Sequence, residues 1–140
     1  MKTSAAGLQF IMDQEGVVLH SYQDQAGYPT IGVGHLIKEG EDFPDQITRE
    51  QALELLADDM SRFEAAVNGY DLDLAQNQFD VLVDFAFNAG EGALAQLLGH
   101  GLDEVPNQLP RWIYSHRNGE RITVDALVNR RAAEAEMWGA

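Results

Sequence analysis

The chain has 140 residues, of which 45% are hydrophobic and 23% are charged, a balance typical of one globular domain rather than a disordered chain. Its 23 acidic residues against 9 basic ones give a formal net charge of −14, which argues against a nucleic-acid partner and against anionic membranes. It has no cysteine, so disulfides, thiolate metal sites and cysteine nucleophiles are excluded.

The N-terminal stretch predicts a helix rather than a leader or an anchor. No run reaches the roughly 18 apolar residues that a membrane span needs. Gln9 and Asp13 interrupt the first apolar segment, which therefore does not fit the core of a signal peptide. We expect a helix from Ser4 to about Glu15, ended by Gly16. We also expect a chain made in the cytoplasm, which needs a separate delivery route if it acts outside the membrane.

Residues 17 to 40 have a different pattern, typical of a small β-lobe. Tyr22, Ile31 and Val33 are interleaved with glycines and a proline. This composition indicates short strands joined by tight turns. The acidic run from Glu39 to Asp42 is expected to be solvated loop charge.

Two longer helices are predicted after the β-lobe. Thr48 and Gln51 form a capping box, and apolar residues continue at helical spacing behind it. Asp73 and Gln76 are expected to start a second helix that stops at Gly90. This helix is apolar on nearly every side, so we expect it at the centre of the core.

The remaining chain predicts shorter helical segments, near residues 92–98, 104–116 and 124–138. Together the segments describe an α+β protein, with a mainly helical body and a small N-terminal β-lobe. No nucleotide-binding, serine-hydrolase or zinc-protease motif occurs. The four histidines have no ligand spacing, so we expect neither a metal site nor a cofactor.

Two carboxylates with contrasting surroundings are candidates for chemistry. Glu15 lies in the last turn of the first helix, where the negative end of the helix dipole disfavours its ionised form. Asp24 follows among polar turn residues, where a carboxylate stays ionised. The first arrangement suits a general acid and the second a base or nucleophile acting on a glycosidic bond. Because the chain has 23 acids, many pairs have comparable spacing, and this pair alone is not specific.

Three sequence blocks together resemble one family. Glu15-x8-Asp24-x5-Thr30, continuing as Thr-Ile-Gly-Val-Gly to His35, resembles the phage-type lysozymes, glycoside hydrolase family 24. Similar blocks follow at 77–90 (NQFDVLVDFAFNAG) and 127–134 (LVNRRAAE), in the order of the family. The segment at 93–98 departs from the family because it lacks the usual aromatic and hydroxyl residues. Many family members are also basic, whereas this chain is acidic.

The resemblance implies one lysozyme-like domain over residues 1–140, with a cleft between the β-lobe and the helical body. It implies a muramidase that cuts the β-1,4 bond between N-acetylmuramic acid and N-acetylglucosamine in peptidoglycan, with inversion. Glu15 would be the general acid, Asp24 and Thr30 would hold the attacking water, and Asn88 would contact a sugar amide. The enzyme is expected to be a monomer, made in the host cytoplasm and delivered by a holin or another route to lyse bacteria.

The resemblance also implies two supporting contacts. Arg130 is expected to reach back to Glu15, with Arg131 as the alternative. His35 is expected to pair with Asp59 on the long helix and to clamp the β-lobe to the helical body. A clamp of this kind contributes to stability rather than to catalysis.

The residues alone leave alternatives open. Asp24 could simply cap a turn, Thr30 could be an ordinary strand residue, and Arg130 could pair with Glu134 on a solvated helix face. A second class of function also remains, namely a catalytically weak lysozyme-fold module that binds the cell wall or a protein. The segment at 93–98 and the acidity of the chain favour this second class, whereas the Glu-Asp-Thr set favours the hydrolase.

Overall fold

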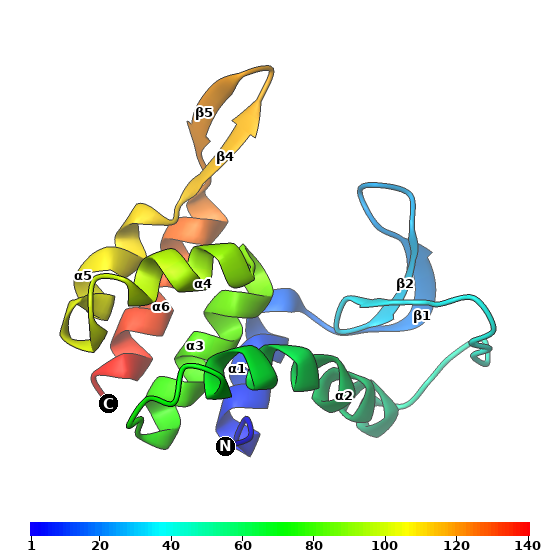
Figure 1. Cartoon of the computed structure of the whole chain (residues 1–140). Helices are drawn as coiled ribbons and strands as arrows, with labels where there is room; N and C mark the ends of the chain where they lie inside the picture. The colour runs from blue at the N-terminus through cyan, green and yellow to red at the C-terminus, as the bar shows by residue number, and fades with distance from the viewer.

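The computed structural model describes all 140 residues, Met1–Ala140 (Figure 1). A mainly helical body carries two small antiparallel sheets, which is the predicted α+β arrangement. The elements in chain order are α1 (Ala5–Glu15), β1 (Val18–Gln23), β2 (Pro29–Gly32), β3 (His35–Leu36), α2 (Arg49–Asn68), α3 (Gln76–Ala89), α4 (Glu91–Leu98), η1 (Leu102–Glu104), α5 (Val105–Gln108), η2 (Leu109–Arg111), β4 (Tyr114–Arg117), β5 (Glu120–Thr123) and α6 (Asp125–Trp138). None of the helices combines the length and the apolar character that crossing a membrane requires.

Local signals set both ends of α1. The Ser4 hydroxyl accepts the N–H of Gly7 at 3.0 Å and caps the first turn. Gly16 ends the helix with φ = +78°, a backbone conformation that favours glycine. These two caps make Glu15 the last residue of α1, at the point where the chain enters the first sheet.

The first sheet has the strand order β1-β2-β3, and all its pairs are antiparallel. Tyr22 is paired with Thr30, and Ile31 is paired with His35. Ile31 packs with Ile47 and Ala52 in a small apolar cluster that joins the sheet to the start of α2. In Figure 1 this sheet projects from one side of the helical body.

Helix α2 begins as predicted, because Thr48 and Gln51 form both hydrogen bonds of the capping box. Helix α3 begins differently. Asp73 lies in the preceding extended segment, and the prediction that it starts the helix was wrong. The N-cap residue is Ala75, whose side chain forms no capping hydrogen bond. Its backbone N–H instead donates to Oε1 of Gln78, a residue in the first turn of the helix, at 2.9 Å.

Helix α3 lies at the centre of the main core, as predicted. The eight residues from Phe79 to Ala86 are all buried, and α1, α2, α4 and α6 pack around them (Figure 1). Two of the eight are aspartates, Asp80 and Asp84. Burying a carboxylate costs free energy unless it is paired or hydrogen-bonded, so both require partners nearby.

The predicted helical segment at 104–116 was wrong in its second half. Residues Tyr114–Arg117 and Glu120–Thr123 form a second antiparallel hairpin, β4–β5, which projects from the helical body in Figure 1. Asn118 (φ +51°) and Gly119 (φ +79°) form its two-residue turn. An Asn-Gly pair between strands is a strong hairpin signal, because both residues tolerate positive φ. The signal was present in the sequence.

Candidate active site

Glu15 is held by a buried arginine from the last helix. Arg130 Nη1 donates to Glu15 Oε1 at 2.8 Å, so the contact expected between these two residues is present. Arg130 is itself anchored by Asp84 on α3, through Nε to Oδ2 at 3.0 Å and Nη2 to Oδ1 at 2.6 Å. Such a two-point contact fixes the plane of the guanidinium. Helices α1, α3 and α6 therefore meet at this carboxyl group.

Asp84 was missed in the sequence, although it is fully buried beneath the site. Its signal was an ionised residue type inside an otherwise apolar helix, which normally requires a buried partner. Burial alone would lower the pKa of Arg130, but the hydrogen bonds and charges of Asp84 and Glu15 outweigh it and raise that pKa above its usual range. Arg130 is therefore cationic at every pH at which the protein is folded.

The second arginine of the pair has different partners. Arg131 is also buried, its guanidinium lies over the ring of Phe85 at 4.8 Å, and it donates to Asn88 Oδ1. Its Nε lies 2.8 Å from Glu134 Oε1, as an ion pair without hydrogen-bond geometry. The predicted alternatives, a solvated Arg130 or an Arg130–Glu134 pair, were wrong, because both arginines point into the core.

Glu134 is completely buried, with Arg131 and Asp84 as charged neighbours. Burial, followed by the nearby charge of Asp84, raises the pKa of Glu134, although Arg131 and Arg130 oppose the shift. Burial also lowers the pKa of Arg131, against the attraction of Glu134. The direction we infer for Glu134 follows from its complete burial beside a second carboxylate.

Asp24 lies in the turn between β1 and β2, and Thr30 lies in β2; both side chains hydrogen-bond to the backbone of Tyr28. Asp24 Oδ1 accepts the N–H groups of Ala26 and Tyr28, at 2.9 and 2.8 Å. The Thr30 hydroxyl donates to the carbonyl oxygen of Tyr28 at 3.0 Å. Asp24 therefore does cap the turn, while its Oδ2 has no hydrogen-bond partner in the chain. Thr30 is almost completely buried.

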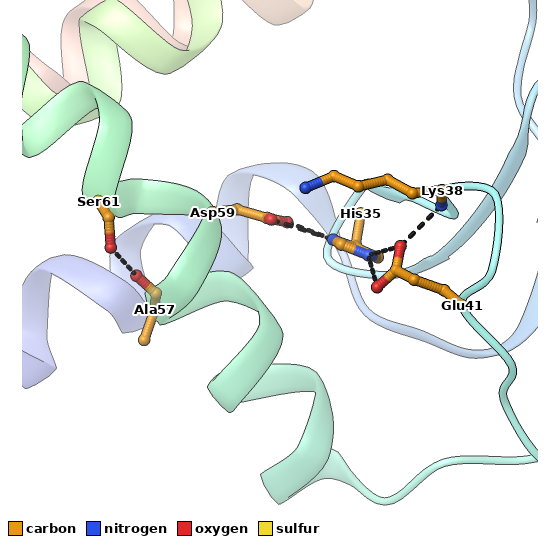
Figure 2. Close-up of polar contacts among 6 residues, drawn as sticks. All are labelled: His35, Lys38, Glu41, Ala57, Asp59 and Ser61. Atoms are coloured by element: carbon orange, nitrogen blue, oxygen red, sulfur yellow. Dashed lines mark hydrogen bonds and ion pairs between the residues drawn. The ribbon is translucent and has the colours of Figure 1, made fainter.

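His35 forms the expected contact with Asp59, and a second contact as well. Figure 2 shows its ring between two carboxylates, with Nδ1 2.8 Å from Asp59 Oδ2 and Nε2 3.0 Å from Glu41 Oε1. Glu41 also accepts the backbone N–H of Lys38 at 2.7 Å. The prediction that the acidic run around Glu41 is only solvated loop charge was therefore wrong for this residue, because the loop folds back onto the histidine.

The charges of this cluster reinforce one another. Burial opposes the charged form of His35, but Asp59 and Glu41 outweigh it and raise the His35 pKa. The Lys38 N–H and the His35 ring lower the pKa of Glu41, against a smaller effect of burial. Since Asp59 belongs to α2 and His35 to β3, the cluster ties the first sheet to the helical body.

Two cavities lie near the predicted site residues, one beside His35 and Asp59 and the other beside Asn88. One of about 350 Å³ lies between β3 and the helices, and its walls include Leu36, Asp59 and Phe87. It lies between the first sheet and the helical body, but Glu15, Asp24 and Thr30 do not line it. The other, of about 530 Å³, lies at the C-terminal end of α3 and includes Asn88 and Tyr114. Asn88, the expected sugar contact, therefore opens into the second cavity.

Comparison with known proteins gives a consistent pattern. Residues 12–134 match the model of the family described as Phage lysozyme. The chain is 37% identical over 149 residues to the endolysin of Bacillus phage PZA, a match that covers 99% of this chain and 55% of that protein. It is 32% identical over 145 residues to the endolysin of Acyrthosiphon pisum secondary endosymbiont phage 1, covering 99% and 98%.

The fold comparison agrees with the sequence comparison. The structure is similar to the muramidase domain of SpmX from Asticaccaulis excentricus, with a TM-score of 0.87 and 32% identity, covering 99% of this chain and 98% of that one. The chain spans about half the length of the Bacillus phage endolysin and nearly the whole of the endosymbiont phage protein.

Proposed function

The chain belongs to the phage lysozyme family, and on that premise we propose that it hydrolyses the β-1,4 bond between N-acetylmuramic acid and N-acetylglucosamine in peptidoglycan and so lyses bacteria. The observation that carries the proposal is the position of Glu15. This carboxyl group ends α1 and is held through one oxygen by Arg130 at 2.8 Å. A general acid requires this kind of fixed orientation toward the leaving group.

Glu15 is the general acid of the proposed mechanism. Arg130 binds Oε1, whereas Oε2 has no hydrogen-bond partner within the chain. The free oxygen carries the proton that passes to the glycosidic oxygen as the bond to the anomeric carbon breaks. Asp84 shares the charge of Arg130.

Asp24 and Thr30 position the attacking water. Oδ2 of Asp24 is free to accept one of the water protons, because Oδ1 is used by the turn. The Thr30 hydroxyl donates to Tyr28, and its oxygen can still accept a hydrogen bond from the water. We expect the carboxyl groups of Glu15 and Asp24 to stand roughly 6.5–9.5 Å apart around the bound sugar, which leaves room for water and gives inversion.

Asn88 is the proposed contact to a sugar acetamido group. Its Oδ1 accepts a hydrogen bond from Arg131, so its orientation is fixed from inside the core. The amide Nδ2 remains to donate to the carbonyl oxygen of an N-acetyl group. We further propose that residues 1–140 act as one monomeric domain and reach the wall through a holin or another delivery route.

A second candidate is a catalytically weak module that binds the wall or a protein. The net charge of −14 favours the protein-binding form of this candidate, because an acidic protein is repelled by an anionic wall. The segment at 93–98 forms most of α4 and buries Ala93, Leu94 and Leu97, so it offers few polar groups to a sugar. The two candidates differ in whether Glu15 turns over substrate.

The test is lysis of Gram-negative cells whose outer membrane has been permeabilised, followed as loss of turbidity. The wild-type protein should clear the suspension, and Glu15→Gln should not, because the amide is nearly isosteric but cannot donate the proton. Circular dichroism and thermal melting establish that the variant is folded. Equal clearing by a folded Glu15→Gln protein removes Glu15 from the mechanism, whereas no clearing by the wild type favours the binding module.

A further inference from the structure

Apart from Asn88, the residues around the cavity of about 530 Å³ have no role in the proposed mechanism. Its walls come from the end of α3, the segment after η2, both strands of the β4–β5 hairpin and the start of α6. Asn88, the proposed acetamido contact, forms part of the wall. The cavity is therefore adjacent to the proposed glycan site, and it can take a group that the same substrate molecule carries.

The cavity is lined by basic side chains in a strongly acidic protein. Arg111, His116 and Arg121 all contribute to its walls. The chain has only 9 basic residues against 23 acidic ones, yet neither of these arginines forms an ion pair. Two guanidinium groups without carboxylate partners place two uncompensated positive charges at the cavity wall, where an anion can bind.

Aromatic side chains complete the cavity. The Arg121 guanidinium lies over the ring of Tyr114, 4.1 Å from its centroid. Trp112 packs edge-on against Phe85, with the ring centroids 5.6 Å apart, and is fixed by the core. A guanidinium that lies over the face of an aromatic ring still has N–H groups pointing outward in its own plane, and these match the two oxygens of a carboxylate.

Resting on the proposed function, we propose that this cavity is an anion subsite, in which Arg111 and Arg121 bind a carboxylate carried by the N-acetylmuramic acid residue of the substrate. Two sources supply this chemistry. One is the lactyl carboxylate of the sugar itself, and the other is the set of carboxylates on the peptide joined to that lactyl group. Binding there offsets the repulsion between an anionic substrate and an acidic protein, and it places N-acetylmuramic acid next to Asn88.

The test measures binding rather than turnover. Three soluble peptidoglycan oligosaccharides are titrated calorimetrically into the Glu15→Gln protein: one with peptides whose carboxylates are free, one with those carboxylates amidated, and one whose peptides have been removed by an amidase, which frees the lactyl carboxylate. Each titration is repeated with a Glu15→Gln protein that also carries both Arg111→Gln and Arg121→Gln. The matched control adds Arg117→Gln, an exposed arginine of the same hairpin that does not line the cavity.

The double substitution should weaken binding of an acidic oligosaccharide about tenfold, as expected for losing hydrogen bonds to a charged group. The amidated oligosaccharide and the Arg117→Gln control should change less than twofold. Weakening only with free peptide carboxylates identifies the peptide as the source, and weakening only after amidase treatment identifies the lactyl group. No weakening of either acidic oligosaccharide, equal weakening of the amidated one, or an equal effect of Arg117→Gln overturns the subsite.

A separate assay keeps the two proposals distinct. If the wild-type protein hydrolyses none of the three oligosaccharides while the arginines still govern binding of the acidic ones, the hydrolase fails and the anion subsite stands. If the wild type hydrolyses them and the arginines do not affect affinity, the subsite alone fails. Absence of any measurable binding by the Glu15→Gln protein overturns the subsite.

Discussion

At the scale of single residues, the site depends on a chain of contacts that runs from the core to the surface. Asp84 is fully buried and orients Arg130, which in turn holds Glu15 where α1 ends. Each member is fixed by the one beneath it. The orientation of Glu15 is therefore determined by packing inside the helical body rather than by the substrate.

Asp84→Asn tests this chain of contacts through stability. The amide keeps the volume but removes the charge that compensates buried Arg130, so unfolding free energy should fall by roughly 3–5 kcal/mol. Urea unfolding at pH 7 measures the change. Asp73→Asn, at an exposed aspartate ahead of the same helix, should stay within about 0.5 kcal/mol. Loss of less than about 1 kcal/mol for Asp84→Asn would mean that the buried pair is not needed.

The His35 cluster predicts a pH window for stability. The His35 pKa is raised on folding, so its contribution is complete below the ordinary value of 6.5 and is lost as the pH rises through the folded value. The Glu41 pKa is lowered, so its contribution is present above the ordinary value of 4.5 and is lost as the pH falls through the folded value. Both contributions are therefore complete between pH 4.5 and 6.5.

A double-mutant cycle with His35→Gln and Asp59→Asn measures the clamp. Inside this window, at pH 5.5, the coupling should be on the order of 1–3 kcal/mol, and it should shrink as the pH is raised through the folded-state pKa of His35. Glu41→Gln should reduce stability at pH 5.5 in the same direction. A coupling of zero at pH 5.5, or one that grows with pH, contradicts the clamp. Lytic activity is expected to change little.

At the scale of elements, the sequence was most informative where a local signal decides the structure. Gly16, the Thr48 capping box and Gly90 were predicted from their own neighbourhoods, and the helices start or end there. The Asn118-Gly119 turn carried an equally local signal that was not used. By contrast, Glu41 binds His35 only because a loop folds back, and neither hydropathy nor spacing encodes that contact.

The candidate site shows the same contrast between residues that a local sequence pattern indicates and contacts that depend on how the chain folds. Glu15, Asp24 and Thr30 could be selected from a sequence block, whereas the role of Asp84 depends on which buried face of α3 meets α6. Asp73 seemed a good cap because its side chain type suits the position, but Gln78 satisfies the backbone instead. The two contacts predicted between distant elements, Arg130 with Glu15 and His35 with Asp59, are present, and both came from the family resemblance rather than from spacing or hydropathy.

The junction of α3 and α4 offers a matched pair of glycines. Gly90 ends α3 with φ = +98°, whereas Gly92 lies within α4, and no neighbouring atom would meet a side chain at either position. Gly90→Ala should lower the unfolding free energy by about 1 kcal/mol or more, because alanine disfavours positive φ. Gly92→Ala should raise it by about 0.5–1 kcal/mol through helix propensity. Changes of the same sign in thermal unfolding would contradict this assignment of the junction.

At the scale of the whole molecule, the net charge of −14 sets a general repulsion within the folded protein. Raising the ionic strength from about 0.01 to 0.15 M shortens the screening length from roughly 30 to 8 Å. The melting temperature at pH 8 should therefore rise with salt. The increase should shrink near pH 5, where carboxylates begin to gain protons. A melting temperature that falls with salt at pH 8 would show that specific ion pairs outweigh the repulsion.

The central claim is that Glu15 donates the proton that cleaves the bond on the N-acetylmuramic acid side. The direct measurement is analysis of the products from purified peptidoglycan, in which new reducing ends are converted to sugar alcohols and identified by mass spectrometry. The wild-type protein should release fragments ending in reduced N-acetylmuramic acid, and folded Glu15→Gln should release none. Fragments ending in reduced N-acetylglucosamine, or equal release by the Gln variant, would contradict the claim.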